Sequence, residues 1–264
     1  MKSESRFLVD VGMKGLPFPM RVASKSQPEG QQTVAEIGVS ARIMQEFEAG
    51  WIDRFIQVLH EHRDRIGTKA LRTNIKDYMQ RLRASTVRVD FEYPFFMEKR
   101  TPVAQEKCLV RYRCTYSARS SDVESEGAAT FTIQVPVITT YPVAADAAIS
   151  GLFAQLSVVT VEVDTHTDAF PEDLVELVDR HALMPVFSFL TNEDQKFVIQ
   201  KIHSGRKTSV VMTDEIKDEL RSMPGIERYS VRCANFGMLH SYSTFIGTEK
   251  SMWVPFSGSE DDEI

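Results

Sequence analysis

The order of the predicted elements is the feature that most restricts the folds open to this 264-residue chain. In its first half, alternating apolar residues indicate four strands, and an apolar period of 3.6 residues indicates two helices between the second strand and the third. The strands are predicted at residues 6–13, 33–39, 85–93 and 107–116, and the helices at 41–66 and 69–83. Ser40 is expected to cap the first helix and Gly67 to end it. This half therefore has the order ββααββ.

The second half follows the same plan, although the two halves share no obvious sequence identity. Pro171, followed by the acidic Glu172 and Asp173, is typical of the first turn of a helix. Strands are predicted at residues 130–138, 156–163, 227–235 and 240–246, and helices at 171–183, 193–203 and 213–222. The repeat is thus one of topology alone.

A tandem ββααββ chain belongs to the α+β class. Each half is expected to form a four-stranded antiparallel sheet with two helices on one face. The other face and the edges of such a sheet would stay uncovered, which is unfavourable for a sheet on its own. Closing several copies into a barrel covers both. We therefore expect a homo-oligomer, a dimer or a tetramer, with sites at sheet edges between subunits.

Polar, turn-rich segments divide the chain. Residues 24–32 are predicted to form a loop, and residues 117–127 are the better candidate for an internal boundary. This gives a first half at residues 1–120 and a second half at residues 121–256. The acidic residues 257–264 are expected to be a disordered tail.

The composition gives no reason to expect a nucleic-acid or membrane partner. The formal net charge is −6, and the chain contains no apolar run of about 18 residues. The N-terminal residues lack the apolar core of a signal peptide. These features predict a cytoplasmic protein without a nucleic-acid or membrane partner.

The three cysteines do not form the spacing of a disulfide framework or of a Cys-x-x-Cys metal clip. Cys108 and Cys114 have the same parity in a predicted strand, so they are expected to face the same side of the sheet. Together with Cys233, they are interpreted as small residues of the hydrophobic core.

Five short stretches occur in the order in which one enzyme family carries similar stretches. They are Val-Gly-Met-Lys-Gly-Leu-Pro-Phe-Pro at 11–19, Ser-Ala-Arg-Ile-Met-Gln-Glu-Phe at 40–47, Tyr-Pro-Phe-Phe-Met-Glu-Lys-Arg-Thr-Pro-Val at 93–103, Asp-Gln-Lys-Phe-Val at 194–198 and Asn-Phe-Gly-Met-Leu-His-Ser-Tyr-Ser at 235–243. On these motifs the chain resembles the type IB GTP cyclohydrolases over nearly its whole length. The resemblance implies the tunnelling fold (T-fold), shared with urate oxidase, and a ligand that is purine-like, pterin-like or another planar heterocycle.

The positions that hold the metal in that family carry different residues here. The family's metal-binding stretch reads roughly Cys-Pro-Cys-Ser-Lys and then Gly-Ala-His-Asn-Gln. In this chain Tyr141 and Val143 stand at the two cysteines and Phe153 at the histidine. None of these side chains is an ordinary zinc ligand, because zinc prefers thiolate, imidazole or carboxylate. We therefore expect no metal site and no cofactor.

The resemblance also bears on the acid–base residues. Gly237 and Gln195 stand where the family has glutamates, while His240 stands at a retained histidine and Tyr242 at a lost one. His240 and Tyr242 are expected to share a face of the last strand, where they are candidates for proton transfer. The alternative for this pair is a hydrogen-bonded structural contact.

Several further residues are candidates for ligand binding. The carboxamide of Gln195 offers a donor and an acceptor, and the basic turn after it suits a phosphate or carboxylate. Two aromatic residues either stack on a planar ligand or fill the volume of the former metal site. The turn comprises His203, Arg206 and Lys207, and the aromatic pair comprises Tyr141 and Phe153.

Three functions agree with these features. The first is a metal-independent enzyme of a specialised biosynthetic pathway, which acts on a small heterocycle or a planar carboxylate-bearing substrate through His240 and Tyr242. The second is a non-catalytic homologue that binds a purine or pterin, or serves as a scaffold. The third is a GTP cyclohydrolase that converts GTP toward dihydroneopterin triphosphate with metal ligands recruited from elsewhere in the chain.

Overall fold

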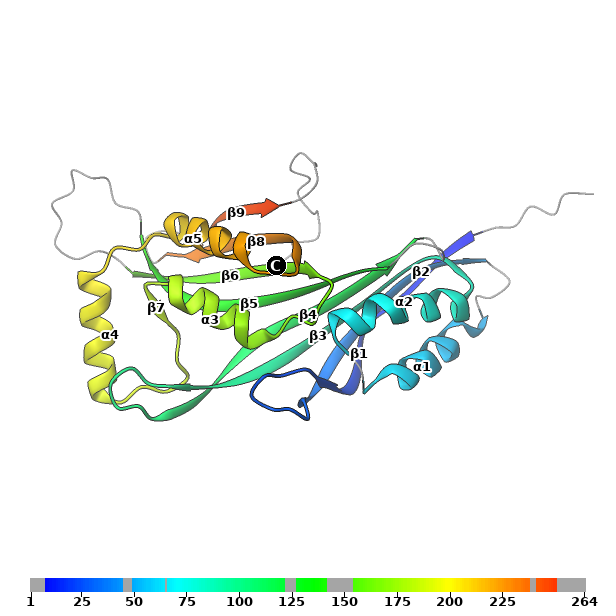
Figure 1. The fold of residues 1–264 in the computed structure, drawn as a ribbon, viewed down its shortest axis with the longest axis horizontal. Helices are drawn as coiled ribbons and strands as arrows, with labels where there is room; N and C mark the ends of the chain where they lie inside the picture. The colour runs from blue at the N-terminus through cyan, green and yellow to red at the C-terminus, as the bar shows by residue number, and fades with distance from the viewer. Residues whose placement is uncertain are drawn as a thin grey trace, which may run out of the picture.

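A single antiparallel sheet runs through both halves of the computed structural model (Figure 1). The structure describes residues 8–44, 49–64, 66–121, 127–141, 154–237 and 241–250. The strand order is β1-β2-β3-β4-β5-β6-β8-β9, and the short β7 pairs with β5 beside this path. The α+β class and the antiparallel arrangement are therefore confirmed. The closed barrel and the number of subunits stay predictions.

The strands and helices lie close to their predicted positions, and most strands are longer. The strands of the first half are β1 (Leu8–Val22), β2 (Gln31–Met44), β3 (Ala84–Arg100) and β4 (Lys107–Ser120). Those of the second half are β5 (Ala128–Thr140), β6 (Ala154–Thr165), β7 (Met184–Pro185), β8 (Ile226–Phe236) and β9 (Thr244–Lys250). The helices are α1 (Trp51–His62), α2 (Thr68–Leu82), α3 (Pro171–His181), α4 (Asn192–Ser204) and α5 (Ser209–Ser222).

The beginning of the first predicted helix is wrong. Residues 41–44 continue β2, and α1 begins at Trp51 after Gly50. Ser40 lies in the middle of β2, between Gly12 and Arg88, so it caps no helix. Gly67 precedes α2 as its N-cap and does not end α1. The error has a physical cause, because the apolar residues at the end of β2 satisfy a period of two as well as one of 3.6.

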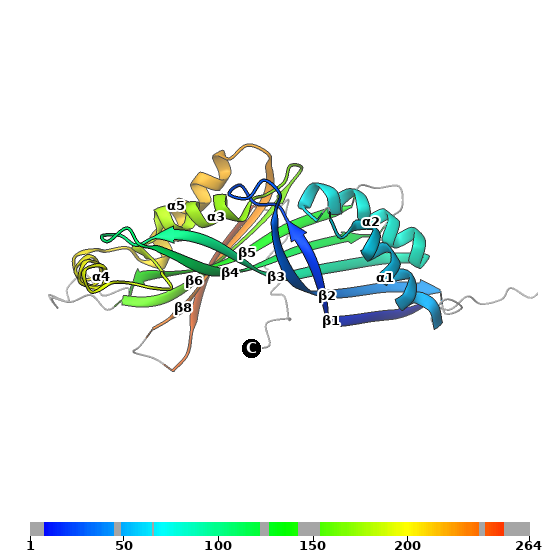
Figure 2. The same cartoon turned by 90° about the horizontal axis from the view of Figure 1, so that it is seen from below.

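The helices and the sheet form two layers. Figure 2 shows α1, α2, α3 and α5 on one face of the sheet, while the opposite face carries no described helix. We call these the helix face and the open face. The helix α4 lies at one end of the sheet (Figure 1), and its only buried residues are Asp194 and Val198. The second half therefore has a third helix that covers little of the sheet.

The hydrophobic core lies between the helices and the helix face, and strand alternation produces it. Every second residue of β3 from Val87 to Phe95 is buried, and the residues between them point to the open face. Cys108, Cys114 and Cys233 are all buried free thiols, as the sequence predicts. Burial raises the pKa of the Cys233 thiol to about 11. No helix among the described residues is long and apolar enough to cross a membrane.

A buried ion cluster joins the two halves where α2 meets the end of β6. Asp164 on β6 is only 2% exposed. It accepts a hydrogen bond of 2.5 Å from Arg72 on α2 and one of 3.0 Å from Nε of Arg228 on β8. Beside it, Thr68 at the start of α2 donates a 2.8 Å hydrogen bond to the carbonyl of Thr167. The halves are thus tied by helix contacts as well as by the pairing of β4 with β5.

Replacing Asp164 by asparagine should destabilise the protein strongly. The change keeps the shape of the side chain but leaves the largely buried guanidinium of Arg72 without its counter-charge, which typically costs about 3 kcal/mol. Urea unfolding followed by circular dichroism measures the loss. The control is Glu61→Gln, which breaks the exposed pair between Glu61 and Arg81 and should change stability little. Equal losses in the two variants would contradict a joining role for Asp164.

Candidate functional site

Five buried polar residues form a hydrogen-bond chain at one end of the sheet. Gln155 Nε2 donates to Thr139 Oγ1 at 3.1 Å, and Thr139 Oγ1 lies 2.8 Å from Ser157 Oγ. Ser157 donates to Asn235 Oδ1 at 2.8 Å, and Asn235 Nδ2 donates to Ser209 Oγ at 3.1 Å. A serine hydroxyl has one proton, so Ser157, which donates to Asn235, must accept from Thr139. The chain therefore has one direction, from Gln155 to Ser209.

The residues of this hydrogen-bond chain occupy inward-facing positions that are apolar along the rest of β5 and β6. On β5 the buried Val137 precedes Thr139, and on β6 the buried Val159 follows Ser157. Because alternate residues of a strand share a side, Thr139 points to the helix face as Val137 does, and Ser157 points there as Val159 does. Buried hydroxyls and amides are costly unless they are hydrogen-bonded, and here each is bonded to the next. A change from valine to bonded polar residues at one end of the sheet marks this end as the candidate site.

Gln155, Tyr141 and Gly237 meet at the Gln155 end of the hydrogen-bond chain. A Cβ atom placed on Gly237 would lie 3.6 Å from Gln155 Oε1 and 3.7 Å from ring carbons of Tyr141. These are ordinary van der Waals distances, so the glycine leaves room for about one methyl group beside the carboxamide oxygen and the ring. Because Gln155 Nε2 is engaged with Thr139, its Oε1 is the atom presented to this space. The arrangement offers a fixed acceptor next to an aromatic ring.

The loop after α4 is fixed to the end of β5 beside Tyr141. The backbone amide of Thr140 donates to the carbonyl of Lys207 at 2.7 Å, and the amide of Lys207 donates to Thr140 Oγ1 at 3.0 Å. The Lys207 ammonium contacts Glu215, which also lies 3.1 Å from His181 Nδ1. The hydrogen bond from Lys207 is the main reason why the pKa of Glu215 is lowered. The charge of Lys207 is thus already balanced within the protein.

The predicted basic turn is therefore only partly available to a ligand. Lys207 lies at the site, but its charge is paired with Glu215. His203 and Arg206 are exposed, and neither has a hydrogen bond or ion pair within the described part of the chain. Arg206 directly precedes Lys207, whose backbone is bonded to Thr140, so it is the basic residue best placed to reach an anionic group.

Gln195 lies away from this site. It is in the first turn of α4, and its Nε2 donates to the carbonyl of Leu190 at 3.3 Å. Ser204 lies nine residue steps further along the helix, which is roughly 14 Å at 1.5 Å per residue. The structure of a single chain therefore does not bring Gln195 together with the other predicted ligand-binding residues.

His240 and Tyr242 were predicted to share one face of the last strand, but Tyr242 does not lie in a strand. The last strand begins at Thr244, not at residue 240, and Tyr242 lies in the bend before it with 61% of its surface exposed. His240 lies outside the described residues, as do Val143 and Phe153. Their roles stay predictions, and the shared-face argument for proton transfer no longer supports the pair.

Sequence reasoning missed the residues of the hydrogen-bond chain, although two of them were in view. Gln155 stands at the glutamine of the family frame Gly-Ala-His-Asn-Gln, and Asn235 begins the Asn-Phe stretch. Thr139, Ser157 and Ser209 have no motif to mark them. The available signal was the alternation itself, which places polar residues at inward positions near the ends of β5 and β6.

The described side chains at this end of the sheet suit hydrogen bonding better than metal binding. No group of three or more histidine, cysteine, aspartate or glutamate side chains gathers within the described residues. The polar groups present near Gly237 are carboxamides, hydroxyls and a phenol, and the carboxamides are already engaged with the hydroxyls. This donor set does not fit the divalent metal that the family resemblance implies.

Asp194, from the stretch that resembles Asp-Glu-Lys, is a structural residue. Its Oδ1 accepts from the amides of Val103 at 2.8 Å and Ala104 at 3.0 Å, and its Oδ2 accepts from Thr191 Oγ1 at 2.7 Å. The carboxylate thus fixes the start of α4 to the turn between β3 and β4. Burial alone would raise the pKa of Asp194, but these hydrogen bonds outweigh it and hold the pKa well below its ordinary value.

Comparison with protein families identifies the same relationship as the motifs. The family model described as Type I GTP cyclohydrolase folE2 matches residues 2–245. A GTP cyclohydrolase FolE2 of Citrifermentans bemidjiense is 31% identical over 241 residues, which cover 91% of this chain and 89% of that protein. A second one, of Geotalea uraniireducens, is 31% identical over 240 residues, which cover 91% of this chain and 87% of that protein.

Comparison with solved structures identifies the fold. A uricase from Bacillus fastidious superimposes with a TM-score of 0.54 at 9% sequence identity and covers 94% of both chains. The urate oxidase of Bacillus sp. TB-90 gives a TM-score of 0.55 at 8% identity, with 93% of this chain and 100% of that chain covered. At these identities the likeness shows the fold alone, which is the T-fold that the sequence resemblance implies.

The low pKa of Asp194 predicts a defined pH dependence. A carboxylate whose folded pKa lies below its unfolded value of 3.8 stabilises the protein above that value, and the stabilisation is lost as the pH falls. Asp194→Asn should therefore lower the urea midpoint clearly at about pH 7, and the difference from the unmodified protein should shrink at about pH 3.

The control for this measurement is Asp218→Asn, which changes an exposed aspartate of α5. It should leave the midpoint almost unchanged at both pH values. A difference between Asp194→Asn and the unmodified protein that is the same at both pH values would show that the carboxylate's charge is not what stabilises this turn.

Proposed function

Because this chain belongs to the Type I GTP cyclohydrolase folE2 family, we propose that it binds a purine or pterin heterocycle at the ends of β5, β6 and β8. The observation that carries the proposal is the buried one-directional hydrogen-bond chain that ends in Gln155. The proteins named in the comparison are GTP cyclohydrolases, so a guanine-type ring system is the first ligand class to test.

The fixed carboxamide of Gln155 supports a specific mode of binding. Its Nε2 is held by Thr139, so its Oε1 acts as an acceptor toward a ligand in the space beside Gly237. Guanine and pterin rings both carry a ring N–H next to an amino group, and these donors match such an acceptor. A carboxamide held by its neighbours loses little side-chain freedom when the ligand binds, which favours affinity.

Two neighbouring side chains complete the proposed site. The half-buried ring of Tyr141 lies beside Gly237 and offers a face on which a flat heterocycle can stack. The exposed guanidinium of Arg206 is close in sequence to the clamp between Lys207 and Thr140, where it would bind a phosphate or carboxylate carried by the ligand. Phe153 remains a proposed second stacking residue.

The proposed role is binding without the metal-dependent reaction of the family. The motif positions that hold cysteine and histidine in the resembling enzymes are Tyr141, Val143 and Phe153, and the described donors do not fit a divalent ion. A metal-independent acid–base reaction at His240 and Tyr242 has less support, since Tyr242 is exposed and outside β9.

A second candidate function is GTP cyclohydrolase activity itself. Its support is the family match over residues 2–245 together with relatives near 31% identity that are GTP cyclohydrolases. This function would need metal ligands from residues other than those of the motif. The two candidates share the heterocycle site and differ in whether the ring is opened.

The binding proposal predicts stabilisation by ligands without a phosphate. Guanosine and neopterin are suitable probes, and either at 100 times its dissociation constant should add about 2.7 kcal/mol to the unfolding free energy. Gly237→Ala should weaken binding about tenfold, because the new methyl group fills the space beside Gln155 and Tyr141 without backbone strain. Isothermal titration calorimetry and thermal unfolding measure the two effects.

The matched control is Gly38→Ala on β2, where a Cβ atom also meets only ordinary contacts. This variant should bind the probes as the unmodified protein does, and both variants should melt at similar temperatures without ligand. Absence of any ligand-dependent shift across purines and pterins would end the binding proposal.

GTP turnover distinguishes the two candidate functions. We expect that protein purified with zinc or manganese in the buffer leaves GTP unchanged, because the motif lacks the donors that would hold the ion. Elemental analysis and chromatography of the nucleotide provide the measurement. Stoichiometric metal together with formation of dihydroneopterin triphosphate would favour the second candidate.

A further inference from the structure

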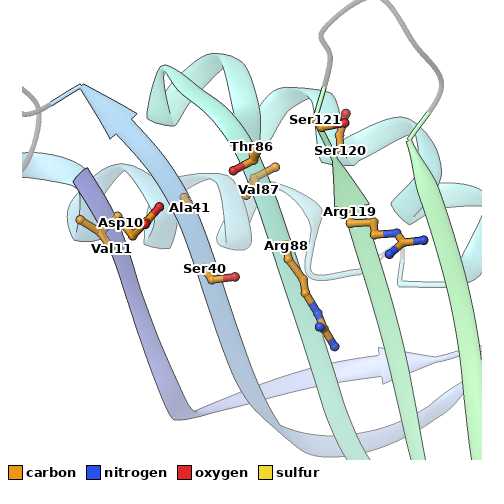
Figure 3. A pocket seen from close by; sticks show the side chains of 10 residues that line it. All are labelled: Asp10, Val11, Ser40, Ala41, Thr86, Val87, Arg88, Arg119, Ser120 and Ser121. Carbon is orange, nitrogen blue, oxygen red and sulfur yellow. The ribbon is translucent and has the colours of Figure 1, made fainter. Parts of the chain in front are cut away.

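A cavity lies on the open face of the sheet, across β1, β2, β3 and β4 (Figure 3). Its volume is about 310 Å³. Its lining combines the apolar residues Val11, Ala41 and Val87 with polar ones. The hydrogen-bond donors that matter here are Ser40, Thr86, Arg88, Arg119 and Ser121. None of these residues belongs to the heterocycle site, and of the five only Ser40 lies in one of the family motifs.

The strand register places the two arginines directly opposite each other. Ser40 on β2 pairs with Arg88 on β3, and Arg88 pairs with Arg119 on β4. Residues that are direct partners on adjacent strands share a face, so both guanidinium groups lie on the open side (Figure 3). Like charges at such positions repel each other unless a counter-charge balances them.

The acidic residues around the cavity balance only part of this charge. Asp90 lies 3.1 Å from Nε of Arg88. Asp10 is engaged by Arg42 through contacts of 2.8 and 3.0 Å, so its charge is already balanced. Arg119 has no acidic partner among the described residues. Among the described residues, the guanidinium of Arg119 is therefore without a counter-charge, in a cavity that also has several hydroxyl groups.

We propose that this cavity binds a phosphate group. A guanidinium fork presents several N–H donors in one plane and matches the oxygens of a phosphate, which can bridge Arg119 and Arg88 and reduce their repulsion. The hydroxyls of Ser40, Thr86 and Ser121 supply further donors around the lining. The ligand brings the negative charge that the described residues do not supply to Arg119.

This cavity is distinct from the heterocycle site. Arg119 pairs with Ala128 at the start of β5, whereas the heterocycle site lies at the other end of β5, beyond Thr140. Twelve residue steps of extended strand span about 40 Å. A single small molecule cannot touch both sites within one chain, so the phosphate proposal does not depend on the proposed function.

The test is binding of inorganic phosphate to the full chain by isothermal titration calorimetry at low ionic strength. Arg119→Gln should weaken binding about tenfold or more, because it removes a charge-assisted contact. Arg119→Lys keeps the charge but not the fork and should have an intermediate effect. The matched control is Arg113→Gln on the same strand and face, because Arg113 is paired with Glu92 at 2.7 Å and lies outside the cavity.

A second calorimetric titration, with glycerol phosphate, shows which kind of molecule supplies the phosphate group. Tighter binding of this monoester than of inorganic phosphate assigns the cavity to a phosphorylated small molecule, and equal binding assigns it to free phosphate. Sulfate should compete with both probes. Equal phosphate affinity of the unmodified protein, Arg119→Gln and Arg113→Gln, or no measurable binding, would overturn the proposal. Binding of guanosine should be unchanged in Arg119→Gln, so this result is separate from the fate of the heterocycle site.

Discussion

Continuous strand pairing from β1 to β9 is the constraint on which the rest of the structure depends. Because alternate residues of a paired strand point to opposite faces, the register decides which side chains meet the helices and which meet the open face. Along most of each strand the helix face is apolar and forms the core. At the ends of β5 and β6 the same face carries Thr139, Gln155 and Ser157, and on the open face the register brings Arg88 and Arg119 together. One geometric rule thus places the core, the candidate site and the cavity.

Much of the fold could be predicted from the sequence, because the element order depends on local periodicity. The predicted elements are wrong where the same residues fit both the strand period of two and the helix period of 3.6. Ala41 and Ile43 fit a strand and a helix alike, and the pairing of β2 with β3, which decides between them, is not local. The predicted strand position of Tyr242 is wrong because the strand was expected to begin at residue 240, whereas the connection from β8 continues up to Thr244. Burial of the three cysteines was predictable because a free cysteine behaves as a small hydrophobic residue, and strand parity placed Cys108 and Cys114 on one face.

The candidate site could be predicted only in part, since it consists of contacts between distant elements. The family frame indicated Tyr141, and the run of basic residues indicated the turn at 203–207. The backbone pairing of Thr140 with Lys207 brings these two segments together. No sequence pattern could show that Glu215 from α5 meets the Lys207 ammonium and balances its charge, or that His181 from α3 contacts the same carboxylate. The hydrogen-bond chain is likewise tertiary, because Ser209 comes from a helix and its partner Asn235 from a strand.

The pattern of replaced residues has a physical explanation under the proposed function. Thiolates and a carboxylate gathered in a poorly solvated site repel one another, and a bound cation is what makes their burial favourable. A chain that loses the ion gains nothing by keeping one or two of these groups, because each would remain as an uncompensated charge. Neutral residues at the positions of the two thiolates and the carboxylate, which are Tyr141, Val143 and Gly237, remove that cost at once. The amides of Gln155 and Asn235 need no cation, since their partners are other neutral groups. Under the proposed function, recognition of a heterocycle would therefore need only these neutral groups and not the charges of metal chemistry.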